Sequence, residues 1–200
     1  PAMVESKTSF EKLELDQIAA LVEKAGDPGF YRGKGGVLIH EGVCHFSHGV
    51  SAANIPLSDD LVTKLGDSIA GNLKHLSSSV QEYAIKAFRS FCSAYVSKLS
   101  IELQVEQTSA KYIRHILEER NSLLCQGYTL ALGSTPANVL VINRSAVFDC
   151  LKRNALVQTN GGASSAVETR VSAVKGLTYM CMTLLQSVTC KADGDALRSF

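Results

Sequence analysis

Glu118–Gly133, with the sequence EERNSLLCQGYTLALG, is the stretch that decides the fold of this chain. Gly127, Ala131 and Gly133 have little or no side chain, and leucine and tyrosine side chains surround them along the stretch. Glycine in the interior of a helix costs about 1 kcal/mol relative to alanine. A helix of this composition is therefore expected where neighbouring helices press closely on its backbone. The stretch predicts an inner helix of an all-helical protein.

The composition is that of a globular chain with enough apolar material for one large core or a stacked array. Of its 200 residues, 46% are hydrophobic, and 20 basic residues nearly balance 19 acidic ones, so the formal net charge is +1. Because no five basic residues cluster, neither a nucleic acid nor a membrane surface is expected as a partner. No apolar run approaches the roughly 18 residues that cross a bilayer, and the N-terminus lacks the pattern of a signal peptide.

Hydrophobic periodicity along the remainder of the chain predicts eight helices and no sheet. Residues 1–7 read as a disordered tail or cloning scar, and residues 8–200 as a single helical domain belonging to a longer protein. The apolar, β-branched segment Val139–Ile142 has no second strand to pair with, so it is expected to be an extended connector or the start of a helix. The polar segment Gln158–Ser164 is expected to be a mobile loop.

Side chains suited to capping a helix mark several predicted helix starts. Three capping boxes, in which a serine or threonine precedes a glutamate by three residues, occur at Thr8–Glu11, Ser79–Glu82 and Ser165–Glu168. Ser58 offers a further N-cap, and the two aspartates that follow it suit the positive end of a helix dipole. The helix that Ser58 opens is expected to continue to Ser77.

The eight helices fall into four pairs, and the second helix of each pair carries a similar short pattern. A small residue lies between a polar and a bulky apolar residue; these small residues are Gly42, Ala87, Gly127 and Gly176. Their numbers differ by 45, 40 and 49, and HEAT and armadillo repeats have periods of about 40 to 47 residues. The prediction is an all-α, HEAT- or armadillo-like α-solenoid of about four helical pairs. A compact eight-helix bundle with irregular packing is the alternative.

The chemistry-bearing residues do not predict an enzyme, a cofactor or a metal site. His40, Cys44 and His48 are spaced for one helix face, but the outer two lie roughly 12 Å apart along a helix, too far to share one ion. Arg32–Gly36 lacks the lysine-serine or lysine-threonine ending and the preceding strand of a phosphate loop. No serine lies in a G-x-S-x-G elbow. The six scattered cysteines are expected to be buried free thiols in a reducing compartment.

Three segments resemble a known family to different degrees. Arg120–Pro136, with the core CQGYTLALGSTP, is similar to the C-terminal region of the tubulin-folding cofactor D family. Glu168–Arg170, followed by Val174–Leu177 and Cys181, resembles the next inner helix of that family, and Arg32–Gly42 matches more weakly. The resemblance covers roughly residues 30–190, and the segments 137–145 and 157–164 depart from the family pattern.

The resemblance implies a cytosolic, cytoskeleton-associated chaperone of HEAT-repeat construction without a catalytic residue in this region. The implied partners are β-tubulin, the tubulin-folding cofactors C and E, and an Arf-like small GTPase. The implied activity is assembly and disassembly of the αβ-tubulin heterodimer, with stimulation of GTP hydrolysis by tubulin in concert with the other cofactors. A HEAT-type adaptor or transport scaffold for another protein cargo is the alternative.

The surface expected to contact a partner is the row of second helices together with the loop at 157–164. Polar residues bracket each small position along this row, and Lys86 and Lys175 are the candidate partner-facing residues. Terminal helices of a stack expose apolar surface that a neighbour normally covers. Some concentration-dependent self-association is therefore also expected.

Overall fold

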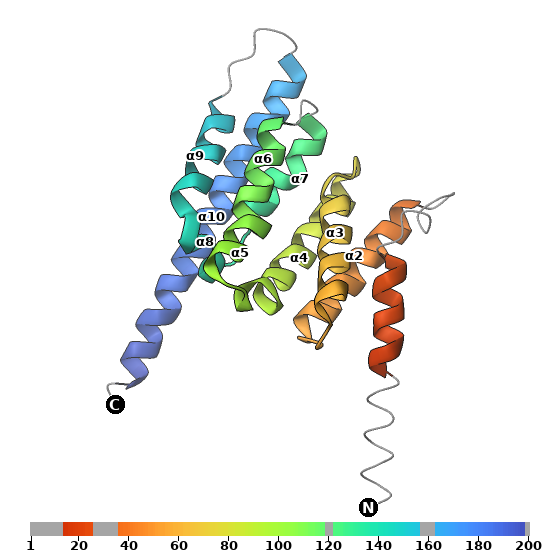
Figure 1. The fold of residues 1–200 in the computed structure, drawn as a ribbon. Helices are drawn as coiled ribbons and strands as arrows, with labels where there is room; N and C mark the ends of the chain where they lie inside the picture. Colours follow the sequence, from red (N-terminus) through yellow and green to blue (C-terminus); the bar gives the residue numbers. More distant parts are fainter. Residues whose placement is uncertain (1–13, 26–35, 119–121, 157–162, 199–200) are drawn as a thin grey trace, which may run out of the picture.

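The computed structural model (Figure 1) describes residues 14–25, 36–118, 122–156 and 163–198, and the regular structure in these ranges is helical throughout. The helices are 14–25, α2 (Gly36–Ala52), α3 (Asp59–Leu73), α4 (Ser78–Ala94), α5 (Ile101–Val105), α6 (Lys111–Glu118), α7 (Ser122–Gly133), α8 (Ala137–Leu140), α9 (Arg144–Ala155) and α10 (Ala163–Arg198). The prediction of an all-helical fold is confirmed, because no strand occurs in these ranges. Within them, no helix combines the length and the apolar character that crossing a membrane requires.

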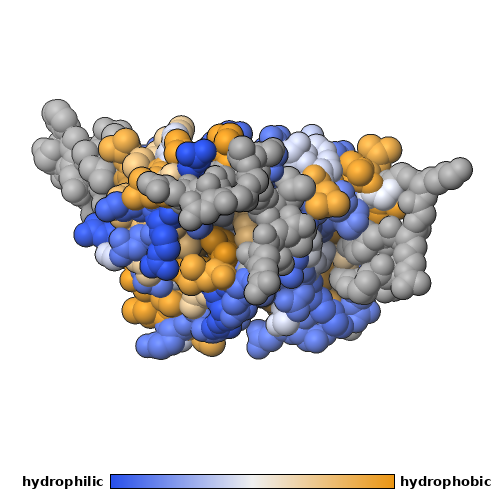
Figure 2. All heavy atoms as spheres, turned by 90° about the horizontal axis from the view of Figure 1, so that it is seen from above, coloured by the Kyte–Doolittle hydropathy of each residue, from blue (hydrophilic) through white to orange (hydrophobic). Residues whose placement is uncertain are grey.

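Successive helices lie side by side, from helix 14–25 at the right of Figure 1 to α9 and α10 at the left. Helix α4 contacts α2, α3 and α7, and α7 in turn contacts α10, which also contacts α9. The second helices of the predicted pairs, α2, α4, α7 and α10, therefore contact one another in series. Figure 2 shows hydrophobic residues reaching the surface near both the left and the right end of this row.

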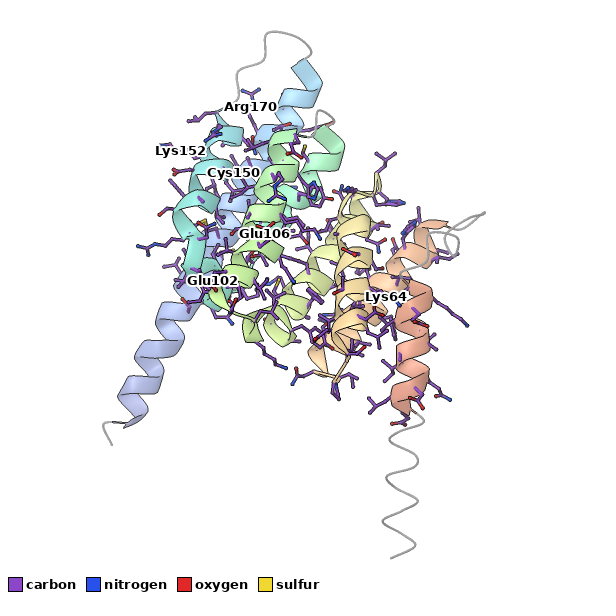
Figure 3. All side chains as sticks on the ribbon, in the orientation of Figure 1. Lys64, Glu102, Glu106, Cys150, Lys152 and Arg170 are labelled. Atoms are coloured by element: carbon purple, nitrogen blue, oxygen red, sulfur yellow. The ribbon has the colours of Figure 1, made fainter. Side chains whose placement is uncertain are left out.

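Helix α3 illustrates how local sequence determines each element. Ser58 is its N-cap and accepts a hydrogen bond at Oγ from the Leu61 amide, as predicted. Leu65, Ile69 and Leu73 follow at four-residue spacing and are completely buried or nearly so. On its other side α3 packs against helix 14–25: the Ser68 hydroxyl donates to the Ala25 carbonyl, 2.9 Å away. Lys64, labelled in Figure 3, bonds Glu23 of that helix at 3.1 Å.

The glycines of α7 allow two helices to approach its backbone closely. A Cβ atom added to Gly127 would collide with the carbonyl of Leu73 at the end of α3. A Cβ atom added to Gly133 would collide with the carbonyl of Gly176 in α10. Both obstacles are backbone atoms, which cannot rotate away as a side chain can. The prediction that α7 is an inner helix is confirmed, because its described side chains from Cys125 to Gly133 are buried or half-buried.

The four predicted small positions do not all behave alike. Ala87, Gly127 and Gly176 are buried, and a Cβ atom on Gly176 would lie 3.0 Å from the carbonyl oxygen of Thr129. Gly42 is different, because it is exposed and a Cβ atom there would meet none of the described residues within 4 Å. The prediction of a packed small residue is therefore wrong at Gly42, which lines an open groove between α2 and helix 14–25.

Two predicted boundaries around α3 and α4 are wrong. Helix α3 ends at Leu73 rather than near Ser77, and Leu76, expected on its apolar stripe, is 67% exposed. The capping box at Ser79–Glu82 does not form, because α4 already begins at Ser78 with Ser77 as the N-cap residue. The Ser77 hydroxyl instead lies 2.8 Å from that of Ser79.

Further departures concern segments with short helical turns. The helix predicted over 102–118 contains a π-helical turn, Glu106–Ala110, between α5 and α6. Val139–Ile142 is not an extended connector, since α8 and the 3-10 turn Val141–Asn143 make it helical, which is the other expectation for this segment. Helix α10 is already formed at Ala163, so Ser165 lies inside it. The predicted tail at 1–7, the box at Thr8–Glu11 and the loop residues 157–162 lie outside the described residues.

Candidate functional site: the exposed edge of α4

Helix α4 places a row of polar side chains on the surface while its opposite side forms part of the core. Val80, Ala84, Ala87, Phe88, Phe91 and Cys92 are buried on the inner side. Glu82, Lys86, Arg89 and Ser93 are exposed, and their spacing of four, three and four residues puts them on one side of the helix. We call these four residues the α4 edge. Two of its three charged members are cations.

Lys86, a predicted partner-facing residue, is exposed and held in place by an aromatic neighbour. Its ammonium lies 5.5 Å from the centre of the Tyr83 ring, within the range of a cation–π contact. The Tyr83 ring in turn lies 4.3 Å from the ring of His45 on α2. The contact orders the lysine without neutralising its charge, so Lys86 can still meet a carboxylate on another molecule.

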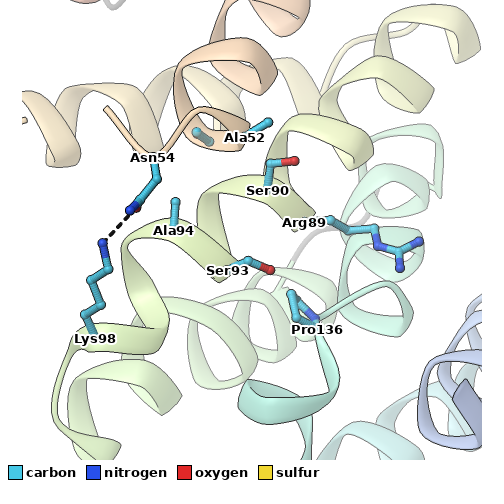
Figure 4. Close-up of a pocket in the computed structure, with 9 residues that line it drawn as sticks. Ala52, Asn54, Arg89, Ser90, Ser93, Ala94, Lys98 and Pro136 are labelled. Carbon is cyan, nitrogen blue, oxygen red and sulfur yellow. Dashed lines mark hydrogen bonds between the residues drawn. The ribbon is translucent and has the colours of Figure 1, made fainter. Parts of the chain in front are cut away.

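A polar groove of about 490 Å³ adjoins the α4 edge (Figure 4). Its lining comes from the end of α2, from α4, from the turn after α4 and from the start of α8; the lining residues are Ser51, Ala52, Asn54, Arg89, Ser90, Ser93, Ala94, Lys98 and Pro136. Arg89 and Lys98 lie on opposite sides of the groove, and none of the described residues that line it is acidic. The groove is therefore positively charged and open to solvent.

Hydrogen bonds fix the groove wall opposite Arg89. Asn54 has a φ of 52°, a left-handed conformation that asparagine tolerates better than most residues, and this turn ends α2. Its side-chain oxygen accepts a hydrogen bond from the Lys98 ammonium at 2.8 Å. On the α4 wall, the Ser90 hydroxyl lies 2.7 Å from Nδ1 of His48 on α2. These two contacts hold α2 and the turn that follows it in a fixed position against α4 and the turn that follows it.

Lys175, the second predicted partner-facing residue, is exposed but does not belong to the α4 edge. It lies on α10, and the buried helix α7 separates α10 from α4. The structure therefore does not bring Lys86 and Lys175 together into one patch. The cation next to Lys86 on the α4 edge is Arg89, and Arg89 shares the groove with Lys98. The three-residue spacing between Lys86 and Arg89 could have indicated Arg89 from the sequence, whereas Lys98 depends on the turn after α4.

The histidines and cysteine considered for a metal site point to different partners. Nδ1 of His40 lies 2.5 Å from the Asn72 side-chain oxygen, while His48 contacts Ser90. Cys44 is buried, and its thiol faces the Val80 carbonyl at 4.0 Å. Burial, with a smaller contribution from Glu41, raises the pKa of Cys44 to about 12, which disfavours the thiolate that binds zinc. Within the described residues no group of three His, Cys, Asp or Glu side chains is placed to hold a metal ion.

The cysteines differ in their exposure to solvent. Cys44, Cys92, Cys125 and Cys150 are buried free thiols, as predicted. Cys181 is also a free thiol but is exposed on α10, so the expectation of burial is wrong there. Burial raises the pKa of both the Cys92 and the Cys150 thiols. Cys190 lies where side chains are not described. Of Arg32–Gly36, the segment without the features of a phosphate loop, only Gly36 belongs to the described residues.

We expect acid to destabilise the corner between α3 and α4 through His75. Its Nδ1 accepts a hydrogen bond from the Ser77 amide at 3.0 Å, which requires that nitrogen to be unprotonated. Burial and the His40 ring, 4.6 Å away, lower the pKa of His75 below 6.5. Because the folded pKa is the lower one, this contribution to stability is complete above about pH 6.5 and is lost as the pH falls through the folded pKa.

The measurement is thermal unfolding followed by circular dichroism between about pH 7 and about pH 5. The melting temperature of the unaltered chain should decrease as the pH is lowered. In His75→Asn this decrease should be smaller, because an asparagine oxygen can accept the Ser77 hydrogen bond without titrating. Part of the fall should persist in the variant, since burial and the nearby Lys74 and Lys111 also lower the pKa of His115. If the melting temperature of His75→Asn decreased with pH as steeply as that of the unaltered chain, His75 would not contribute to the loss of stability in acid.

No protein-family model matches the chain, and no solved structure matches it at a significant level.

Proposed function

We propose that this chain is a protein-binding helical scaffold of the α-solenoid type, and that its α4 edge receives a carboxylate-bearing surface of a partner. The interpretation of the fold as an α-solenoid is supported by the contacts that α2 makes with α4, α4 with α7, and α7 with α10. The observation that carries the binding role is the open groove at the α4 edge, which has a cation on either side and no acidic side chain among its described lining residues. Charge complementarity of this kind steers association and selects partners.

The partner we propose is β-tubulin, alone or within the αβ-tubulin heterodimer. This assignment draws on the resemblance of Arg120–Pro136 to tubulin-folding cofactor D. In this proposal the chain contributes binding surface in the cytoplasm, with the cofactors C and E and an Arf-like small GTPase as further partners. It acts on tubulin folding and on GTP hydrolysis by tubulin through the complex, not through a catalytic residue of its own.

The test is the affinity of the chain for tubulin after charge reversal on the α4 edge. The double variant Lys86→Glu, Arg89→Glu is expected to weaken binding about tenfold at low salt, because two exposed attractions become repulsions. Lys152→Glu is the matched control. Lys152 is exposed on α9, which contacts α7 at the left end of the row of helices, whereas α4 lies on the other side of α7 (Figure 3). The readout is biolayer interferometry at two salt concentrations.

Two results would decide against parts of the proposal. Equal weakening by Lys152→Glu would indicate a general charge effect and remove the α4 edge from consideration. Absence of tubulin binding by the unaltered chain would reject the tubulin assignment. The adaptor alternative would then be tested by capturing partners on the unaltered chain and on the double variant, and it requires a protein lost only from the latter. Lys175→Glu, assayed in parallel, reports whether α10 contributes to the same contact.

A further inference from the structure

Helix α10 carries apolar side chains on a side that faces solvent as well as on the side that packs on the core. Val167, Val171, Val174, Thr178, Cys181 and Leu185 follow one another at alternating spacings of four and three residues, and all six are exposed. We call these six residues the α10 seam. Val174 is 54% exposed and Leu185 is 65% exposed. The Thr178 hydroxyl donates to the Val174 carbonyl of its own helix, which leaves the threonine methyl group available for packing.

The opposite side of α10 packs on α7 and α9, and the half-buried Leu177 and Leu184 also contact the core. Ser172, Ala173, Gly176, Met180 and Thr183 are buried there. A helix that needed only this core contact would be expected to carry polar residues on its exposed side, where α10 has valine and leucine. The alternating spacing is that of a coiled-coil seam, in which such residues interdigitate with those of a second helix.

The charges that flank the α10 seam favour a second copy of α10 in antiparallel orientation. Glu168 and Lys175 lie on the same flank, seven residues apart, roughly 10.5 Å along the helix, too far to pair with each other. When two copies cross antiparallel with their centre between Val171 and Val174, Glu168 of each copy meets Lys175 of the other. In a parallel pair Lys175 would instead meet Arg170 of the second copy, a like charge.

We infer that two copies of this chain associate through antiparallel packing of their α10 seams. The contact is isologous, so each favourable charge pair occurs twice, and the dimer closes without exposing a further seam. The inference is independent of any partner at the α4 edge, because α7 separates α4 from α10.

The test is sedimentation equilibrium of the whole chain over a wide range of concentration. Val174→Lys is expected to weaken the dimer at least about tenfold, because a charge would be buried in the seam. Val141→Lys is the matched control, since Val141 is also 54% exposed but lies in the 3-10 turn after α8. Both variants should keep the helical circular dichroism of the unaltered chain.

A charge exchange tests the orientation. Glu168→Lys and Lys175→Glu should each weaken the dimer a few-fold, and the double variant should recover most of the loss, because the pair is re-formed across the interface in the opposite sense. A chain that stays monomeric at the highest attainable concentration overturns the inference, and so does a dimer that Val174→Lys leaves unchanged. In a Cys190→Ser background, a disulfide-linked dimer through Cys181 on mild oxidation would indicate parallel packing and overturn the antiparallel arrangement.

Discussion

Replacing Gly133 by alanine is expected to lower the free energy of unfolding by about 3 kcal/mol or more, near the upper end of what overpacking usually costs. The added methyl group would collide with the carbonyl of Gly176, so α7 and α10 could not keep their present separation. The obstacle is backbone on a neighbouring helix, and relief requires a whole helix to move. Urea unfolding monitored by far-ultraviolet circular dichroism measures the change, and the same experiment on Gly127→Ala should show a loss of similar size.

Gly42→Ala is the control for Gly133→Ala because it makes the same chemical change in a helix interior without any neighbour. Alanine is favoured over glycine in a helix by about 0.5–1 kcal/mol, and a Cβ atom at position 42 would meet no atom of the described part of the chain within 4 Å. Gly42→Ala should therefore stabilise the chain. If Gly133→Ala were as harmless as Gly42→Ala, the close contact between α7 and α10 would not exist in solution.

The contrast between Gly42 and Gly133 also shows how far the sequence predicts this fold. The apolar spacing of Leu65, Ile69 and Leu73 was sufficient to predict a helix and its buried side, because helical periodicity is a local property. The glycines of α7 were correctly predicted to be buried because several leucines surround them. Gly42 was not, since a small residue beside an apolar one is found equally well on the outer side of a helix. The side is decided by neighbours distant in the sequence.

The candidate site was only partly predictable for a related reason. Lys86 is identifiable from the sequence as an exposed position, because it lies opposite the apolar stripe of α4. The groove beside it joins Asn54, Arg89 and Lys98 through the turn that ends α2 and the turn that ends α4. Neither turn contains a sequence motif from which its geometry can be predicted. Likewise, the exposed side of α10 could be recognised only when the structure showed which of its two sides packs on α7.

Truncation of Phe88 is expected to cause a loss of about 3–5 kcal/mol, the usual range for removing a buried phenylalanine side chain. Phe88 is 2% exposed on the inner side of α4. Its ring meets that of Tyr112 edge to face at 5.1 Å, Tyr112 lies 5.2 Å from Tyr128, and His115 stacks on Tyr128 at 5.1 Å. This chain of rings joins α4 to α6 and α7. Phe88→Ala removes its first member and leaves a cavity beneath the α4 edge.

Phe148→Ala provides the matched control for Phe88→Ala, because Phe148 on α9 is 44% exposed and its removal should cost no more than about 1 kcal/mol. The free energy of unfolding of both variants is measured by urea denaturation. The same m-value, the slope of that free energy against urea concentration, is used for both. Phe88→Ala should in addition weaken binding at the α4 edge at temperatures well below its melting transition, since Lys86 and Arg89 are carried by the same helix. A Phe88→Ala variant as stable as Phe148→Ala would mean that the aromatic chain does not hold α4 against α6 and α7.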